Sequence, residues 1–235
     1  MSFSSGLAEM AAAPQALRFD AVLFDLDGTL VDSAPDLAGA ANDLRAARGL
    51  AALPYERLRP MVGAGARGMV GVAFGLAPGD SGYETLRDEF LRAYEQRLLH
   101  QTVVFPGALH LLSQLEESGL PWGVVTNKAT RFTLPLLAGL GLAERAGAVV
   151  CGDTTPHAKP HPAPLLEAAQ RIGVAAERCV YVGDDLRDIQ AGRAAGMATV
   201  AAGWGYLGEG EPVQRWGADE VLATPLQLLN WLQLA

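Results

Sequence analysis

Short apolar runs alternate along the chain with longer segments in which apolar residues recur at helical spacing. The apolar runs are residues 21–24, 122–125, 148–151, 179–182, 199–202 and 220–222. The segments of helical spacing are about 107–118, 129–140, 162–172 and 186–195, and a glycine stands near the end of each, where helices commonly stop. Strands that are apolar on both faces need cover on both sides. The alternation therefore predicts an α/β fold, with a parallel sheet and helices on both of its faces.

A long segment, residues 32–105, separates the first two apolar runs and carries a helical pattern without an obvious strand. Its start, Ser33 to Asp36, resembles a capping box with proline in the first turn, which predicts a helix that runs to about Arg48. A second helix is expected over 83–99, where apolar residues again keep helical spacing. We therefore expect an all-helical insertion after the first strand.

The size and composition fit one α/β core with such an insertion. The chain has 235 residues, of which 50% are hydrophobic and 19% are charged. This composition excludes wholesale disorder and supports a sizeable core. The expected division is a flexible extension over 1–19, a core over 20–31 and 106–235, and the helical insertion over 32–105.

The charge and the apolar runs exclude several kinds of partner. The formal net charge is −8, so the chain has no basic excess for binding a nucleic-acid backbone, although a small anion needs only one local cation or a metal. The longest uncharged stretch, 98–115, is broken by polar residues and by Pro106–Gly107, which argues against a membrane span. Cys151 and Cys179 each adjoin an apolar run and are expected to be buried, reduced thiols. We therefore expect a cytoplasmic protein without nucleic-acid or membrane partners.

Two segments match the glycine pattern GxGxxG, at 63–68 and at 203–208. A dinucleotide site needs this pattern between a strand and a helix. The first segment follows no predicted strand, and the second does not open onto a helix. We therefore do not expect a dinucleotide cofactor.

The sharpest chemical signal is a pair of carboxylates, Asp25 and Asp27, directly after the first apolar run. Residues at i and i+2 of an extended chain lie on one side, and ligand sites of open α/β sheets lie at the carboxyl ends of the strands. Neighbouring carboxylates favour either a shared proton or a cation between them. A polar turn is the plainer interpretation of the isolated Asp-x-Asp-Gly pattern, but the complete hexapeptide from Asp25 to Leu30 argues against it.

Three further segments carry candidate chemistry. Thr126 and Asn127 end the second apolar run and could bind a phosphoryl oxygen, although such residues often cap a helix. Lys159 lies in a proline-rich loop, where a lysine is most often simply solvated. Asp184 and Asp188 open a helix after the fourth run, where they could hold Mg²⁺ or merely complement the helix dipole.

Taken together and in this order, the four segments resemble the haloacid dehalogenase-like hydrolase superfamily, over about residues 20–230. The resemblance implies a Rossmann-like parallel sheet, with the insertion as an all-helical cap domain. It implies that Asp25 is the nucleophile and that Asp27 is the general acid and base. It further implies roles for the strand-end Thr126, for Lys159, and for Asp184 with Asp188 as the acidic metal motif. An aspartate at the position of Asp27 is typical of the phosphatases and phosphomutases of this superfamily.

Within the superfamily, the segments 24–33, 125–128 and 183–189 resemble phosphoglycolate phosphatases. The segments 123–132, 141–145 and 216–219 resemble bacterial N-acetylmuramic acid 6-phosphate phosphatases, a branch of cell-wall recycling. Asp185 departs from the usual serine, which leaves open which of Asp184, Asp185 and Asp188 contacts the metal. The loop around Lys159 also departs from the common pattern, which leaves the substrate contacts open.

The resemblance therefore implies a Mg²⁺-dependent phosphomonoester hydrolase that acts through an aspartyl-phosphate on a small carboxylated phosphate ester. The resemblance implies that the catalytic residues are Asp25, Asp27 and Lys159. It implies that Thr126, Asn127 and Lys159 bind the phosphate. It implies that the metal is bound by Asp25, by the backbone carbonyl of Asp27, and by Asp184 and Asp188. A sugar phosphomutase would share every one of these core residues. A non-catalytic regulator that binds a phosphorylated ligand would not need the nucleophile. The sequence leaves open whether the chain is a monomer or a homodimer.

Discrimination between substrates is expected to come from the insertion, because the core handles only the phosphoryl group. The best candidate is Arg67 in the glycine-rich segment 63–68, which is expected to be a loop. A planar guanidinium suits the carboxylate that both candidate substrates carry. The alternative is an ordinary turn between helices with a solvated arginine.

Overall fold

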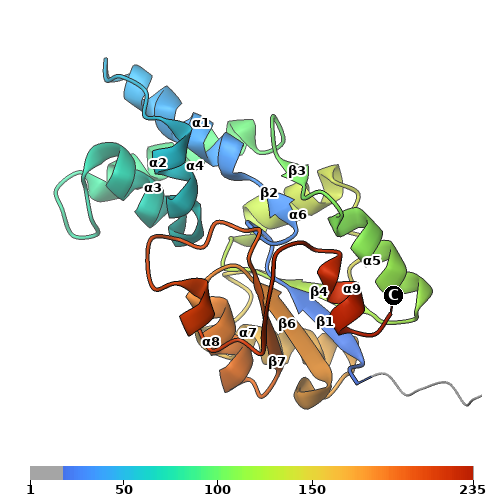
Figure 1. The fold of residues 1–235 in the computed structure, drawn as a ribbon. Coiled ribbons are helices and arrows are strands. Elements are labelled where there is room, and N and C mark those ends of the chain that lie inside the picture. The colour runs from blue at the N-terminus through green and yellow to red at the C-terminus, as the bar shows by residue number, and fades with distance from the viewer. Residues whose placement is uncertain (1–17, 235) are drawn as a thin grey trace, which may run out of the picture.

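The structure is a computed structural model that describes residues 18–234 (Figure 1). Its core is a six-stranded parallel sheet in the order β5-β4-β1-β6-β7-β8. The strands are β1 (Ala21–Phe24), β4 (Trp122–Val125), β5 (Ala148–Val150), β6 (Cys179–Gly183), β7 (Ala198–Ala202) and β8 (Glu220–Leu222). Each predicted strand is present, and the predicted α/β fold with a parallel sheet is confirmed.

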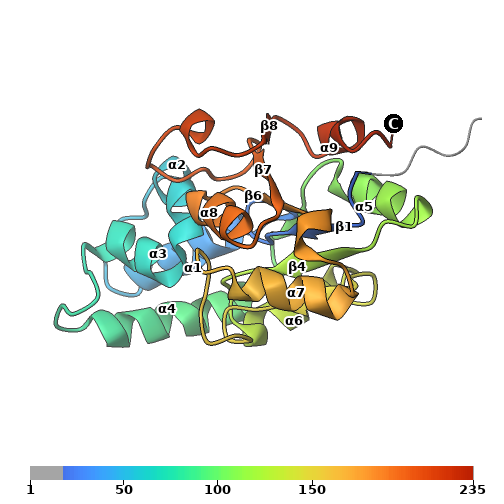
Figure 2. The ribbon, with the colours of Figure 1, turned by 90° about the horizontal axis from the view of Figure 1, so that it is seen from below.

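Helices cover both faces of this sheet because the side chains of β1 alternate between two apolar layers. Val22 and Phe24 join a cluster that includes residues of α5 (Ala108–Glu117), α6 (Thr130–Gly139) and α9 (Gln227–Trp231). Ala21 and Leu23 join a second cluster, with residues of α7 (Ala163–Ile172) and α8 (Leu186–Ala194). In the view from below, α5 and α7 lie on opposite sides of β1 (Figure 2). Both cysteines are buried and free, as predicted.

The segment between β1 and β4 forms the helices α1 (Ala34–Ala46), α2 (Tyr55–Leu58), η1 (Arg59–Ala64), α3 (Gly65–Phe74) and α4 (Tyr83–Arg97). The two predicted helices are present as α1 and α4, which lie side by side (Figure 1). The expectation of a purely helical segment is wrong, because β3 (Val103–Val104) pairs antiparallel with β2 (Val31–Asp32). The two segments that connect the insertion to the core lie side by side there, and their backbone groups hydrogen-bond to one another. None of the described helices combines the length and apolarity needed to cross a bilayer.

The start of α1 differs from the predicted capping box. The Ser33 hydroxyl makes no cap and instead donates to the Asp27 carboxylate. The hydroxyl of Tyr206 accepts the Ser33 backbone N–H at 2.9 Å, so a residue distant in sequence satisfies this helix end. The buried carboxylate of Asp36 accepts the backbone N–H of Thr102 at 2.8 Å instead of closing the box. At this helix start, hydrogen bonds to residues outside the helix have therefore replaced the hydrogen bonds that a capping box would form within it.

The predicted N-terminal extension over 1–19 lies outside the described residues except at its end. At that end, Phe19 is buried and stacks on the ring of Trp231 with 5.4 Å between centroids. The packed chain therefore includes Phe19. The predicted boundaries of the core and the insertion stay predictions.

Candidate active site

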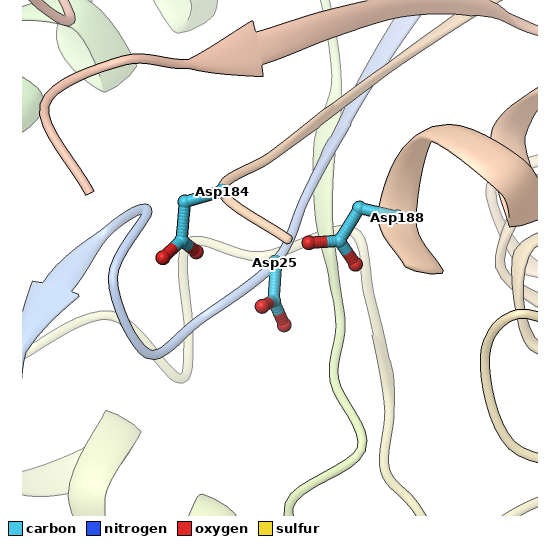
Figure 3. Close-up of side chains that lie close together, drawn as sticks. All are labelled: Asp25, Asp184 and Asp188. Carbon is cyan, nitrogen blue, oxygen red and sulfur yellow. The ribbon is translucent and has the colours of Figure 1, made fainter. Parts of the chain in front are cut away.

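Three acidic side chains meet where the central strands β1 and β6 end. Asp25 follows β1 directly, Asp184 follows β6, and Asp188 lies in the first turn of α8. Figure 3 shows their carboxylates turned toward one another, and oxygens of the three lie within 4.8 Å of each other. Asp184 and Asp188 are buried, and the Asp25 side chain is 13% exposed. Three carboxylates so close together in a poorly solvated place repel one another unless a cation or protons intervene.

The approach of Asp184 to this cluster depends on glycine at position 28. Gly28 has a φ of +86°, and a Cβ there would lie 2.1 Å from Oδ2 of Asp184. The Asp184 carboxylate accepts hydrogen bonds from the Thr29 hydroxyl at 2.9 Å and from the backbone N–H of Tyr206 at 2.8 Å. The turn after β1 therefore holds Asp184 by close contact and by hydrogen bonding.

The environment of the cluster disfavours ionised carboxylates. Burial raises the pKa of Asp25 to about 7, although the nearby Lys159 ammonium opposes the shift and Asp188 adds to it. Burial also raises the pKa of Asp184 well above its ordinary value, and the charges of Asp25 and Asp188 raise it further. A hard divalent cation takes carboxylate oxygens as ligands and would remove this penalty, so the donor set fits such an ion.

In the metal-free protein, the difference in Tm between Asp25→Asn and the unchanged chain should move in favour of the variant as the pH rises. The folded-state pKa of Asp25 lies above its ordinary value of 3.8, so ionisation of this carboxyl destabilises the folded state. The effect should be absent below about pH 4, where both states hold the proton, and should level off above about pH 7. Thermal unfolding in EDTA across this range measures it. A difference that does not change with pH would show that Asp25 titrates normally.

Lys159 places a fixed positive charge beside the cluster. Its buried Nζ lies 2.8 Å from Oδ1 of Asp25 and 2.7 Å from Oδ1 of Asp188. The hydroxyl of Tyr181, at 2.8 Å, and the Val125 carbonyl, at 3.0 Å, are the other acceptors that share its three hydrogens. Burial alone would lower the pKa of Lys159, but the two carboxylates raise it above the ordinary value. The ammonium therefore stays protonated.

Asn127 holds the loop that carries Lys159. Its amide oxygen accepts the Lys159 backbone N–H at 2.9 Å, and its amide nitrogen donates to the Lys159 carbonyl at 3.0 Å. One hydrogen of the Asn127 amide nitrogen remains available after these bonds, so its predicted use for a phosphoryl oxygen stays a prediction. Thr126 is buried at the end of β4, and its hydroxyl accepts the Lys128 backbone N–H at 3.1 Å. That hydroxyl keeps its own hydrogen for another acceptor.

Lys128 is a site residue that our sequence analysis did not single out. Its Nζ lies 3.0 and 3.1 Å from the two carboxylate oxygens of Asp27, and the Ser33 hydroxyl donates to the same carboxylate. Burial alone would lower the pKa of Lys128, but Asp27 raises it above the ordinary value. Its position directly after Thr126 and Asn127 is the signal that could have identified it.

The hydrogen bonds at the start of α8 distinguish Asp188, which belongs to the cluster, from Asp185, which does not. Asp185 caps the helix, accepts the backbone N–H of Arg187 at 2.9 Å and forms an ion pair with its guanidinium. It lies outside the group formed by Asp25, Asp184 and Asp188. The backbone N–H of Asp185 in turn donates to Oδ2 of Asp188 at 3.1 Å.

A cavity of about 340 Å³ opens above the cluster, between the sheet and the helices of the insertion. Its lining includes Asp25, Asp27, Thr126 and Lys159 from the core, and Gly63, Phe90 and Tyr94 from the insertion. Arg67 is exposed and is not part of this lining. The predicted loop over 63–68 is wrong, because α3 begins at Gly65 and Arg67 lies within that helix.

Comparison with known proteins agrees with this geometry. The model of the haloacid dehalogenase-like hydrolase family matches residues 19–196. A phosphoglycolate phosphatase of Xanthomonas campestris is 49% identical over 214 residues, which is 90% of this chain and 96% of the relative. An N-acetylmuramic acid 6-phosphate phosphatase of Pseudomonas aeruginosa is 43% identical over 219 residues, covering 93% of this chain and 97% of the relative. A crystal structure described as a predicted phosphoglycolate phosphatase from Haemophilus somnus superposes with a TM-score of 0.81 at 27% identity, over 91% of this chain and 98% of the other.

Proposed function

Because the chain belongs to the haloacid dehalogenase-like hydrolases and its relatives are phosphatases, we propose that it hydrolyses a small carboxylated phosphate monoester, with Mg²⁺ and an aspartyl-phosphate on Asp25. The observation that carries this proposal is the meeting of Asp25, Asp184 and Asp188 beside a buried lysine at the end of the central strands. The candidate substrates are 2-phosphoglycolate and N-acetylmuramic acid 6-phosphate, after the names of the two relatives.

The residues that would hold Mg²⁺ are Asp25 and Asp184, with the backbone carbonyl of Asp27. When bound, the ion offsets the repulsion between the nucleophile and the phosphate dianion. Asp188 belongs to the same cluster, but its two oxygens already face Lys159 and the backbone N–H of Asp185. We therefore propose that Asp188 lies close to the bound ion and is not one of its direct ligands.

In the first half of the reaction, a carboxylate oxygen of Asp25 attacks phosphorus and the bond to the ester oxygen breaks. Asp27 gives a proton to that oxygen, and the alcohol leaves. In the second half, Asp27 takes a proton from water as the water attacks the phosphorus of the aspartyl-phosphate. The bond from phosphorus to Asp25 then breaks, and inorganic phosphate leaves. Lys159 and the Thr126 hydroxyl stabilise the phosphoryl oxygens throughout.

We further propose that residues 32–105 act as a cap over this chemistry. The contacts that join the insertion to the core beside the cluster include hydrogen bonds from Arg59 to the Gly205 carbonyl, at 3.1 Å, and from Arg187 to the Gly63 carbonyl. Closure of such a cap excludes bulk water, and reopening releases the product.

The proposed activity is tested by release of inorganic phosphate. The protein is incubated with Mg²⁺ and with p-nitrophenyl phosphate, 2-phosphoglycolate or N-acetylmuramic acid 6-phosphate, and phosphate is measured over time. Turnover of at least one ester supports the proposal. Conversion of a sugar phosphate into an isomer without phosphate release would identify a phosphomutase instead.

Asp27→Asn should lower kcat by about 10²–10⁴-fold, the usual contribution of a general acid and base. Mg²⁺ binding should be affected less, because the proposed metal contact of Asp27 is its backbone carbonyl. Steady-state kinetics at saturating Mg²⁺, together with a Mg²⁺ titration, separate the two effects. A normal kcat at saturating metal combined with a large loss of Mg²⁺ affinity would overturn the assignment.

A further inference from the structure

The cavity contains one cationic side chain whose charge is not matched. Among the described residues, Lys128, Arg131, Lys159 and Arg187 supply its cations. Lys128 is paired with Asp27, Lys159 with Asp25 and Asp188, and Arg187 with Asp185. The Arg131 guanidinium has no ion pair or hydrogen bond with any residue that the structure describes. It lies over the ring of its neighbour Phe132, 4.5 Å from the ring centroid, and the residue is exposed.

Arg131 lies on a different element from the residues proposed to bind the phosphoryl group. It stands in the first turn of α6, the helix that follows the Thr126–Lys128 segment at the end of β4. The phosphoryl oxygens are served by Lys159 and Thr126 under the proposed function. Arg131 is therefore available for a second anionic group on the same ligand, and a guanidinium suits a carboxylate through paired hydrogen bonds.

The wall beside Arg131 is apolar and aromatic. Phe90 and Tyr94 of α4 and Phe132 of α6 line the cavity, and the rings of Tyr94 and Phe132 lie 5.5 Å apart. A two-carbon acid would leave most of this wall uncovered. Pockets of some 300 Å³ or more commonly enclose ligands with a ring, and the faces of a sugar ring pack well on aromatic side chains.

One polar group in this wall lacks a partner. Tyr94 is 2% exposed, and its hydroxyl forms no hydrogen bond of ordinary geometry with the described residues, although the Lys128 ammonium lies 4.6 Å from the centre of its ring. Burial raises the pKa of Tyr94 to about 12, so the hydroxyl is neutral and can both donate and accept. Buried hydroxyls without a partner are uncommon because they cost free energy. A polar group on the body of the ligand would satisfy this one.

We propose that Arg131 binds a carboxylate of the substrate remote from the phosphate, and that the aromatic wall and the Tyr94 hydroxyl receive a sugar-sized body between them. This inference rests on the proposed function, and it specifies which phosphate ester that site selects. The chemistry corresponds to a pyranose 6-phosphate with a carboxylate side arm, as in N-acetylmuramic acid 6-phosphate, rather than to 2-phosphoglycolate. It assigns to Arg131 the role that the sequence suggested for Arg67.

The test uses two sugar phosphates that differ only in the lactyl arm, which carries the carboxylate. N-acetylglucosamine 6-phosphate lacks the lactyl arm of N-acetylmuramic acid 6-phosphate and is otherwise the same. Arg131→Ala should lower kcat/KM for the carboxylated sugar about tenfold or more, mainly through KM, and should change the other sugar less than about twofold. Arg67→Ala, the matched control on the exposed face of α3, should leave both values unchanged.

Tyr94→Phe tests the wall separately, because it removes only the hydroxyl. It should raise KM for both sugar phosphates. The unchanged enzyme should show a higher kcat/KM on N-acetylmuramic acid 6-phosphate than on 2-phosphoglycolate.

The possible outcomes distinguish a failure of the carboxylate and sugar assignments from a failure of the proposed phosphatase function. An equal loss on both sugars in Arg131→Ala, or no loss on either, would overturn the carboxylate assignment. A preference of the unchanged enzyme for 2-phosphoglycolate would refute the proposal that the substrate has a sugar-sized body. Failure to release phosphate from any ester, p-nitrophenyl phosphate included, would instead refute the proposed function.

Discussion

Replacement of Asp25 by asparagine should abolish phosphate release, with kcat lower by more than about 10⁴-fold, as is usual when a nucleophile is removed. An amide is a poor nucleophile, and it cannot supply the charged oxygen that both Mg²⁺ and phosphorus require. No neighbour can replace it, because Asp184 is held by Thr29 and Tyr206 and Asp188 faces Lys159. Phosphate release from p-nitrophenyl phosphate measures the loss.

The same variant can show whether the lost step is the formation of the aspartyl-phosphate. Enzyme quenched in acid during turnover should carry a phosphoryl group that hydroxylamine removes, and Asp25→Asn should carry none. The fold of the variant is checked by thermal unfolding, and its identity by mass spectrometry, because deamidation would restore the aspartate. Substantial turnover in a verified preparation would exclude Asp25 as the nucleophile.

Removal of divalent cations should silence the enzyme almost completely, and Mg²⁺ should restore it. The cluster would place three carboxylates beside the phosphate dianion of the proposed substrate. Lys159 is the one cation in direct contact with them in the described part of the chain. Burial is the main cause of the raised pKa values of Asp25 and Asp184, and the neighbouring carboxylates raise both further. Activity is measured in EDTA and again during titration with Mg²⁺. Full activity after rigorous chelation would refute the proposed site.

A matched pair of variants identifies the metal ligand in the turn before α8. Asp184→Asn should raise the Mg²⁺ concentration needed for half-maximal activity by about tenfold or more, as loss of a ligand contact does. Asp185→Asn removes the neighbouring carboxylate, which lies outside the cluster and is paired with Arg187, and should leave that concentration nearly unchanged. The opposite ranking would place Asp185 on the ion.

The strands and the order of the core elements could be predicted because they depend on local patterns. A run that is apolar on both faces can be stable only inside a covered sheet, and the helical repeats and glycine stops between such runs are equally local. The candidate positions of Asp25, Thr126 and Asp184 follow from the same logic, because each is the first polar residue after a strand. In a parallel sheet, such residues come to one edge whichever order the strands take.

The sequence did not predict the hydrogen bonds of side chains that can bond either to a neighbour in the chain or to a residue far away in it. Ser33 and Asp36 have the residue types of a capping box, but a buried hydroxyl or carboxylate takes whichever partner the packed chain brings nearest. In the fold, these partners are Asp27 and Thr102, and Tyr206 takes over the cap. The β2–β3 pair was missed because each strand is too short to show a period.

The amino-acid sequence by itself therefore determined the sheet, the edge at which the candidate site lies and the carboxylates that meet there. The tertiary structure alone decided which cations are neutralised there and which remain available. Lys128, Arg131 and Arg67 are all basic residues near glycine-rich or polar segments, and nothing local distinguishes them. Only the packing of α4 and α6 over the end of β4 pairs Lys128 with Asp27, brings Arg131 to the cavity and leaves Arg67 on the outer surface. The physical reason is that charge pairing depends on distances in space, and these are set by side-chain packing between segments far apart in the chain.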